Sequence, residues 1–276
     1  MEENRLMEDV AKALENVRAQ CPLIHNITNY VTVNDVANIV LAVGASPIMA
    51  DDIAEAGDIA SIAGALVLNI GTLNARTVES MVEAGKRANQ AGVPVVLDPV
   101  GAGASALRNE TTERLLKDVK LTVLRGNLSE ISFIAGEQSN TKGVDAGEAD
   151  ADNDAVAIAK KAAKQLDCVV GITGQVDVVS DGTRVAKIEN GVKLLGKVTG
   201  TGCMTSALVG SYCGANRDAF TATVAGIATM GMAGEISYKA QADRGTGSFH
   251  IGIIDAVSRM DGETVKVWAK LHEVER

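Results

Sequence analysis

The chain has 276 residues, of which 46% are hydrophobic, 22% charged and 3% aromatic, and its formal net charge is -9. This composition fits one large globular domain over residues 1–276, with a core packed mainly by Ala, Val, Ile and Leu. The acidic balance and the absence of a long basic run argue against nucleic-acid binding, and a polyanionic substrate would need cations or backbone N–H groups placed locally.

The cysteines and the N-terminal segment bear on the cellular compartment. Cys21, Cys168, Cys203 and Cys213 form no C-x-x-C pair and no zinc-binding spacing, so we expect free thiols in a reducing cytoplasm. The first twenty residues are acidic and amphipathic, unlike a signal peptide. No apolar run reaches the length of a membrane span, so we expect no membrane partner.

The first 63 residues mix helical patterns with short extended pieces. Apolar residues at helical spacing predict a helix over 5–18, and a second helix over 33–43 ends at the natural C-cap Gly44. Residues 22–30 are dense in polar side chains, and a loop is the preferred interpretation, with a ligand pocket that includes Asn29 as the alternative. A short strand over 46–50 contains Met49, which also suits plain core packing, and a short acidic helix follows over 51–63.

From residue 65 an apolar strand, a polar loop and an amphipathic helix repeat. The pattern predicts strands at 65–70, 93–97, 121–124 and 168–172, and helices at 75–90, 105–118 and 151–166. Such repetition indicates βαβ units around a mostly parallel sheet, and ligands bind such sheets beyond the carboxyl ends of the strands. The loops expected there hold Asn69, Asp98, Arg125, Asn127, Glu130 and Thr173.

The remaining segments are a hairpin, helices and one acidic stretch. Residues 176–188 predict an antiparallel hairpin with an Asp-Gly turn. Residues 203–214 and 217–239 are rich in small apolar residues and predict buried helices, and 248–274 predict two more. We interpret the acidic stretch 143–154 as a solvated loop, because it lacks the spacing of a calcium site.

Gly200, Thr201 and Gly202 form a flexible loop that opens a helix at about Gly202, with Cys203 in its first turn. Unpaired N–H groups and the helix dipole make such a start an anion site, typically for phosphate, although a plain turn is the alternative. Asp98 and Glu130 could hold Mg²⁺ through water, and Arg125 fits phosphate oxygens. Together these groups indicate phosphoryl transfer to an alcohol.

Seven segments carry a family resemblance, and they occur in the family's order along nearly the whole chain. They are PLIHNITNYVTVN (22–34), GASPIM (44–49), LNIGTL (68–73), LDPVGAG (97–103), RGNLSE (125–130), ITGQ (172–175) and VTGTGC (198–203). Together they resemble the hydroxyethylthiazole kinase family of the ribokinase-like superfamily. The resemblance implies a three-layer α/β/α fold with a mostly parallel central sheet, and ATP-dependent, Mg²⁺-assisted phosphorylation of 4-methyl-5-(2-hydroxyethyl)thiazole in thiamine salvage.

The resemblance also implies roles for individual positions. Met49 and Gly200 would contact the thiazole, with Asn29 a weaker pocket candidate. Arg125 and Thr173 would bind ATP, and Asp98 and Glu130 would organise Mg²⁺. The family resemblance further implies a homotrimer whose substrate sites lie between subunits.

Cys203 stands where the wider superfamily usually has an aspartate that acts as a base. Cysteine at this position matches the narrower thiazole kinase pattern. In a loose transition state the alcohol needs little deprotonation, so our hypothesis is that Cys203 orients the hydroxyl and is at most a weak base. The alternative is a small residue that merely starts the helix. The rival functions are another kinase of the superfamily and a nucleotide-binding regulatory protein.

Overall fold

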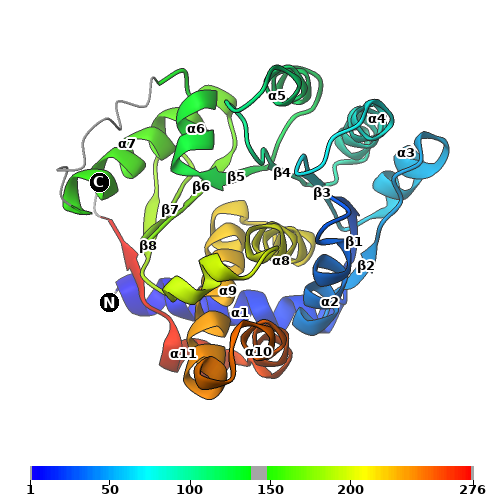
Figure 1. The fold of residues 1–276 in the computed structure, drawn as a ribbon. Helices are drawn as coiled ribbons and strands as arrows, with labels where there is room; N and C mark the ends of the chain where they lie inside the picture. The colour runs from blue at the N-terminus through cyan, green and yellow to red at the C-terminus, as the bar shows by residue number, and fades with distance from the viewer. Residues whose placement is uncertain (1, 138–147, 275–276) are drawn as a thin grey trace.

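A nine-stranded sheet lies at the centre of the computed structural model, which describes residues 2–137 and 148–274 (Figure 1). The strand order is β2-β1-β3-β4-β5-β6-β7-β8-β9; the pairs from β2 to β6 are parallel and the last three pairs are antiparallel. The strands are β1 (Leu23–Ile27), β2 (Ser46–Ile48), β3 (Ala65–Asn69), β4 (Val95–Asp98), β5 (Val123–Asn127), β6 (Val169–Thr173), β7 (Asp177–Ser180), β8 (Val185–Ile188) and β9 (Leu271–Glu273).

Helices cover both faces of the sheet, so the expected three-layer α/β/α architecture is confirmed (Figure 1). One face carries α1 (Glu2–Gln20), α2 (Val33–Val43), α8 (Thr201–Ala215), α9 (Ala219–Gln241), α10 (Thr246–Arg259) and α11 (Gly262–Trp268). The other carries α3 (Ile53–Ile62), α4 (Ala75–Ala91), α5 (Ala106–Asp118), α6 (Leu128–Ile134) and α7 (Glu148–Leu166). Two 3₁₀ turns lie at Lys193–Lys197 and Ala242–Arg244.

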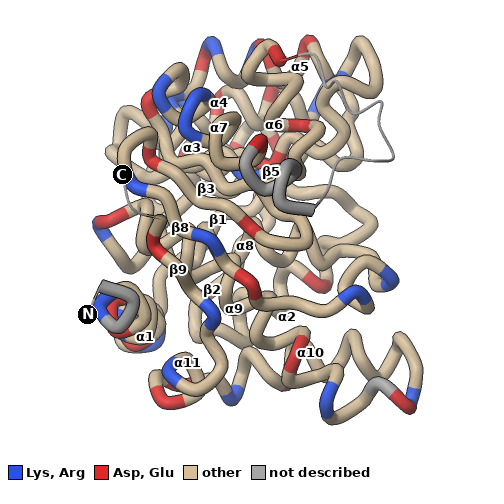
Figure 2. The backbone as a smooth tube through the Cα atoms, turned by 90° about the vertical axis from the view of Figure 1, so that its left-hand side faces the viewer, with Lys and Arg blue, Asp and Glu red and all other residues tan. Residues whose placement is uncertain are grey.

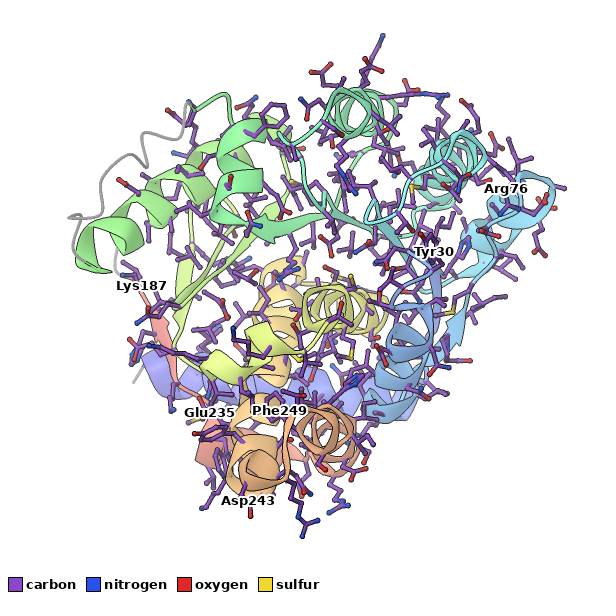
Figure 3. All side chains as sticks on the ribbon, in the orientation of Figure 1. Tyr30, Arg76, Lys187, Glu235, Asp243 and Phe249 are labelled. Carbon is purple, nitrogen blue, oxygen red and sulfur yellow. The ribbon has the colours of Figure 1, made fainter. Side chains whose placement is uncertain are left out.

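Each face of the sheet has its own apolar core. Val95, Val96 and Leu97 of β4 are fully buried, and adjacent residues of this strand join opposite cores. A strand buried on both faces needs such a continuous apolar run, which is why the sequence pattern was readable here. The side chains fill the space between the layers, and Phe249 of α10 is fully buried among the helices of the first face (Figure 3).

Glycine contacts bring α8 close to the sheet. A Cβ at Gly210 would lie 2.3 Å from Cγ2 of Val67 on β3, and a Cβ at Gly226 of α9 would lie 2.7 Å from the backbone of Val209. A side chain in place of either glycine would force these elements apart. The close approach sets the first turn of α8 at the carboxyl ends of the parallel strands.

Several expectations were confirmed, and four were wrong. Gly44 caps α2 with a left-handed φ of 103°, and the hairpin β7–β8 is present. Residues 23–27, expected in a loop, form β1 between β2 and β3. The expectation failed because polar side chains in this segment, which suggested exposure, are buried in the sheet. The tail holds the strand β9 in addition to its helices. The acidic stretch 143–154 is helical from Glu148 on, and its first part lies outside the described residues.

The expectation that no apolar run reaches the length of a membrane span was also wrong. By length and composition alone α9 is long and apolar enough to cross a membrane. However, 78% of its apolar window is buried inside the structure, as for a core helix. Charged residues of both signs are interspersed along the described chain (Figure 2), so an anionic ligand depends on cations at its own site.

Candidate active site

The carboxyl ends of the parallel strands bring most of the expected site residues together. Asn69 ends β3 and is in register with Asp98 at the end of β4. Arg125 lies in β5, and Asn127 at the end of that strand is in register with Thr173 at the end of β6. Asn69, Asp98 and Arg125 are exposed by 1%, 2% and 8%. The convergence expected from topology is therefore present, and it is buried.

The loop before α8 faces this edge with a left-handed glycine. Gly200 has a φ of 88° and is the N-cap, and α8 begins at Thr201, one residue from the predicted start. A Cβ at Gly200 would lie 3.0 Å from Thr32 Cγ2 and 3.4 Å from Asp35 Oδ2. No side chain of the described residues caps this helix start. Its N–H groups therefore remain available for an anion.

Arg125 holds this loop against the sheet. Its Nη1 donates to the Gly202 carbonyl oxygen at 3.1 Å, and its Nη2 donates to the Thr173 hydroxyl. The same guanidinium lies 3.6 Å from Oδ2 of Asp98. Nη1 and Nη2 each donate one hydrogen bond to the protein, and Nε is buried without a partner among the described residues, so Arg125 offers an anion its charge and the hydrogens left over.

Asp98 is a buried carboxylate among several polar partners. Its Oδ2 accepts hydrogen bonds from Asn69 Nδ2 and Ser206 Oγ, each at 2.8 Å. Burial raises the pKa of Asp98 to about 6, against the lowering effects of Arg125 and Ser206, and the nearby charge of Glu130 adds to the rise. Asp98 is therefore ionised at neutral pH, with its charge only partly balanced by Arg125.

Glu130 organises the neighbouring loop. Its Oε1 accepts from the Gly101 N–H at 2.7 Å, and its Oε2 accepts from the Asn127 N–H at 2.8 Å, which closes the capping box of α6. Each carboxylate oxygen can accept a second partner. Glu130 thus connects the loop after β4 to the start of α6 and keeps acceptor capacity for a ligand.

Asp98 and Glu130 fit the chemistry of a hydrated Mg²⁺ ion. Mg²⁺ prefers carboxylate, phosphate and water oxygens and often takes only one or two protein ligands. A cation near both groups would relieve the repulsion by which Glu130 raises the pKa of Asp98. Within the described residues, no group of three or more His, Cys, Asp or Glu side chains could hold a metal.

Cys203 lies in the first turn of α8, partly exposed, beside two asparagines. Its Sγ accepts from Asn29 Nδ2 at 3.2 Å and from Asn69 Nδ2 at 3.3 Å. The sequence placed Asn69 at this edge but gave it no role. No sequence spacing connects these residues, because they come from three separate elements.

The segment with Met49 is held by a histidine that sequence reasoning missed. His25 is fully buried in β1, and its Nε2 lies 2.7 Å from the carbonyl oxygen of Ala50. A carbonyl only accepts, so Nε2 carries the proton. Burial lowers the pKa of His25 and so favours the neutral ring, and the hydrogen bond to Ala50 opposes this lowering only in part. Met49 itself packs partly buried against the core of the first face.

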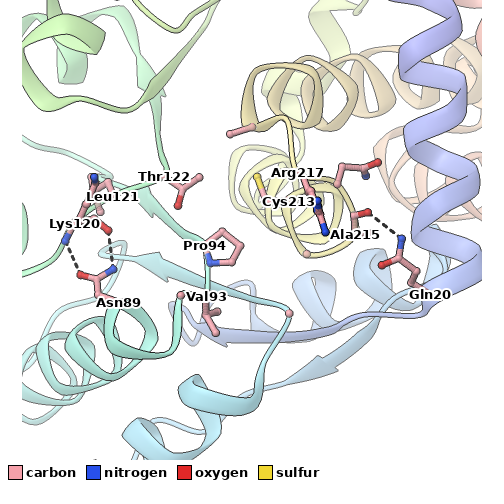
Figure 4. Close-up of a pocket in the computed structure, with 15 residues that line it drawn as sticks. Gln20, Asn89, Val93, Pro94, Lys120, Leu121, Thr122, Cys213, Ala215 and Arg217 are labelled. Atoms are coloured by element: carbon pink, nitrogen blue, oxygen red, sulfur yellow. Dashed lines mark hydrogen bonds between the residues drawn. The ribbon is translucent and has the colours of Figure 1, made fainter.

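Two hollows of the described chain differ in their relation to this edge. A cavity of about 570 Å³ lies beside Glu130 and is lined by residues 101–104, Asn127 and Phe133. A larger one of about 770 Å³ lies where β4 and β5 begin and α8 ends (Figure 4). Its Asn89 and Gln20 side chains bond to Lys120 and to the Ala215 carbonyl oxygen. Of these two cavities, only the smaller is lined by one of the two site carboxylates, Glu130.

The arrangement of the sheet and its helices is a ribokinase-like fold. A ribokinase-like superfamily protein from Enterococcus faecalis superposes with a TM-score of 0.61 at 8% identity, covering 93% of this chain and 83% of that one. At such low identity the similarity concerns the fold alone. In that fold the buried edge after β3, β4 and β5 is the expected place for a ligand.

The family follows from closer relatives. The model of the hydroxyethylthiazole kinase family matches residues 14–263. A hydroxyethylthiazole kinase of Ruminiclostridium cellulolyticum is 62% identical over 268 residues, which cover 97% of this chain and 98% of that protein. The structure of a hydroxyethylthiazole kinase protein from Pyrococcus horikoshii has a TM-score of 0.88 at 40% identity, covering 96% of this chain and 99% of that one. The chain belongs to the hydroxyethylthiazole kinase family, and is thus an ATP-dependent kinase.

Gly200→Ala is expected to lower kcat/KM on the order of tenfold, because a left-handed φ costs a residue with a Cβ about 1–2 kcal/mol. The added Cβ would also press on Thr32. Gly196→Ala is the matched control, since that glycine has no positive φ and nothing lies within 4 Å of its Cβ position. The measurement is ATP-dependent turnover. Equal losses in the two variants would contradict the role given to the Gly200 conformation.

The kcat/KM profile is expected to fall on the acid side with a midpoint near pH 6, because Asp98 loses its charge as the pH falls through its pKa of about 6. Asp98→Asn should remove most activity and, with it, this acid limb. Asp177→Asn is the control, because burial also raises the pKa of this carboxyl group, to about 7. Its Oδ1 accepts the Gly174 N–H at 2.8 Å and is given no role in the site, so the acid limb should survive this change. An acid limb that survives Asp98→Asn would contradict the assignment.

Proposed function

We propose that this kinase transfers the γ-phosphoryl group of ATP to the hydroxyl of 4-methyl-5-(2-hydroxyethyl)thiazole, a step of thiamine salvage in the cytoplasm. The observation that carries the substrate is the 62% identity to a hydroxyethylthiazole kinase across 97% of the chain. We further propose that residues 1–276 act as a single catalytic domain. The roles of individual residues below are argued from their positions.

ATP is bound by Arg125, Thr173 and the loop Gly200-Thr201-Gly202. Arg125 is held by Thr173 and by the carbonyl oxygen of Gly202, so its charge stays beside the start of α8. In a loose transition state the charge of the transferring group is spread over its three outer oxygens, and the N–H groups of this loop can donate hydrogen bonds to them. Because these groups are fixed before the reaction, little reorganisation is needed when the transition state forms.

Asp98 and Glu130 would hold the magnesium ion through water. When bound, it supplies charge neutralisation between the phosphate groups. The protein contributes two carboxylates that are already oriented: Asp98 by Asn69 and Ser206, and Glu130 by two backbone N–H groups. Arg125, 3.6 Å from Asp98, keeps this carboxylate ionised at neutral pH.

The thiazole is bound beside Met49, Gly200 and Asn29, with its hydroxyl facing Cys203. Tyr30 and Val31, next to Asn29, are 79% and 57% exposed, and Tyr30 stands at the rim of the same edge (Figure 3). Exposed apolar side chains beside a pocket suit a cover by another chain. This supports a homotrimer in which the thiazole site is completed by a neighbouring subunit.

Turnover is expected with hydroxyethylthiazole and not with hydroxymethylpyrimidine, pyridoxal or ribose, when ADP release is measured from Mg·ATP with each alcohol. The geometry of the phosphate site is independent of the alcohol, so the panel tests the substrate separately from the chemistry. Turnover with another of these alcohols alone would refute the thiazole and keep the kinase. ATP binding without turnover on any alcohol would favour a nucleotide-binding regulatory protein.

A further inference from the structure

The amides of Asn29 and Asn69 enclose the sulfur of Cys203 from two sides. Asn29 follows β1 and is 4% exposed, and Asn69 ends β3 and is 1% exposed. Asn29 Nδ2 also donates to Asn69 Oδ1 at 3.0 Å, and Asn69 Nδ2 donates to Asp98 Oδ2 at 2.8 Å. An amide nitrogen carries two hydrogens, so each asparagine uses one for the sulfur and one for its other partner.

Backbone donors fix the orientation of both amides. The Gly71 N–H donates to Asn69 Oδ1 at 2.9 Å, and the Thr32 N–H donates to Asn29 Oδ1 at 3.2 Å. The Thr32 hydroxyl donates to the same Asn29 oxygen at 3.1 Å. A backbone N–H can only donate, so turning either amide over would set its NH₂ group against that N–H. The nitrogens must therefore face Cys203.

Gly71 gives a second indication that the two amides are tightly placed. A Cβ at Gly71 would lie 2.8 Å from Asn29 Nδ2 and 2.9 Å from Asn69 Oδ1. Glycine at this position is thus required by the close approach of both side chains. The loop after β3 therefore packs directly against the pair of amides.

Two N–H donors at one sulfur restrict what that sulfur can do. A neutral thiol has two lone pairs and one S–H, and the amides occupy both lone pairs. The S–H must then point away from Asn29 and Asn69, toward the accessible side of this partly exposed residue. A thiolate has one further lone pair, which would point in that same direction.

We propose that Asn29 and Asn69 are positioning residues that hold two acceptor sites of Cys203, so that the thiol can only donate toward the alcohol and the thiolate alone can accept the alcohol's hydrogen. The part that concerns the alcohol rests on the proposed function. Asn29 thereby serves the reacting hydroxyl through Cys203, besides any contact with the thiazole ring. Asn69 connects Cys203 to Asp98 through a single amide group.

Other charged groups near the first turn of α8 are the same in every variant of the test below. Arg125 of β5 faces the Gly202 carbonyl oxygen, and Asp98 of β4 lies behind Asn69. Asp35 of α2 faces Gly200, and Nε2 of His250 on α10 lies 3.2 Å from Oδ1 of Asp35. Asn29→Leu leaves the hydrogen bonds of Asp98 in place, whereas Asn69→Leu also removes one of them, so Asn29→Leu is the more direct test of an amide donor.

The test measures the rate of Cys203 alkylation by iodoacetamide against pH, by peptide mass spectrometry on the full chain without substrates. Asn29→Leu and Asn69→Leu keep the side-chain size and remove the donors. The pH midpoint for Cys203 is expected to rise by about one unit in each, since losing a hydrogen bond to a charged group costs on the order of tenfold. Exposed Cys21 is the internal control and should not change.

A Cys203 midpoint that stays in place in both folded variants would overturn the proposal. If the leucine variants fail to fold, Gly71→Ala displaces both amides and should raise the midpoint, and an unchanged midpoint would again refute the proposal. Asn26→Leu removes another buried asparagine of β1, whose amide binds the Ile24 carbonyl oxygen. An equal rise there would show that the effect is not specific to the two amides.

The alkylation result is independent of turnover. A wild-type protein that phosphorylates none of the alcohols, yet shows the expected rise in the variants, would refute the proposed function and keep the amide contacts. A protein that phosphorylates the thiazole without any rise in the variants would do the reverse. The two failures are therefore distinguishable.

Discussion

The burial of Asp98 beside Arg125 is the constraint on which the rest of this edge depends. A charged group taken out of water must find charge and hydrogen bonds inside the protein. For Asp98 these come from Asn69 of β3, Arg125 of β5 and Ser206 of α8. Three elements that are distant in the sequence are thereby fixed around one carboxylate, and any of them that moves leaves a buried charge unpaired.

Arg125 extends this constraint to the phosphate-facing loop. Its Nη1 lies near Asp98 and also donates to the Gly202 carbonyl oxygen, and its Nη2 donates to the Thr173 hydroxyl. The start of α8 is therefore oriented by the same charge pair that keeps Asp98 ionised. The close packing at Gly210 holds the rest of α8 on the sheet, so the position of its first turn is determined at two points.

The sequence predicted those parts of the fold that have one dominant cause. Apolar runs such as 93–97 gave the central strands, because both faces of those strands are buried, and Gly44 ended α2 because it takes a left-handed conformation. The strand β1 was missed because His25 and Asn26 break the apolar pattern, although the sheet buries both. The short strand β9 was missed because its pairing with β8 brings together residues more than eighty positions apart.

The location of the candidate site could be predicted from the sequence, but the hydrogen bonds among its side chains could not. Topology put Asn69, Asp98, Arg125 and Thr173 at one edge, and the glycine loop was found from its composition. No spacing in the sequence reveals that Asn29 and Asn69 both bond to Cys203, or that His25 holds the Ala50 carbonyl oxygen. Such contacts depend on side-chain directions across three or more elements, which only the folded chain specifies.

The measurement that tests the account most directly is protection of Cys203 by the substrate. Iodoacetamide labelling of Cys203 would be followed at increasing concentrations of hydroxyethylthiazole, with Cys21 as the exposed reference thiol. The account predicts that the thiazole slows labelling of Cys203 alone, with half-protection near the concentration that half-saturates turnover. Undiminished labelling of Cys203 at a thiazole concentration that saturates turnover would contradict the account, because the reacting hydroxyl would then lie elsewhere.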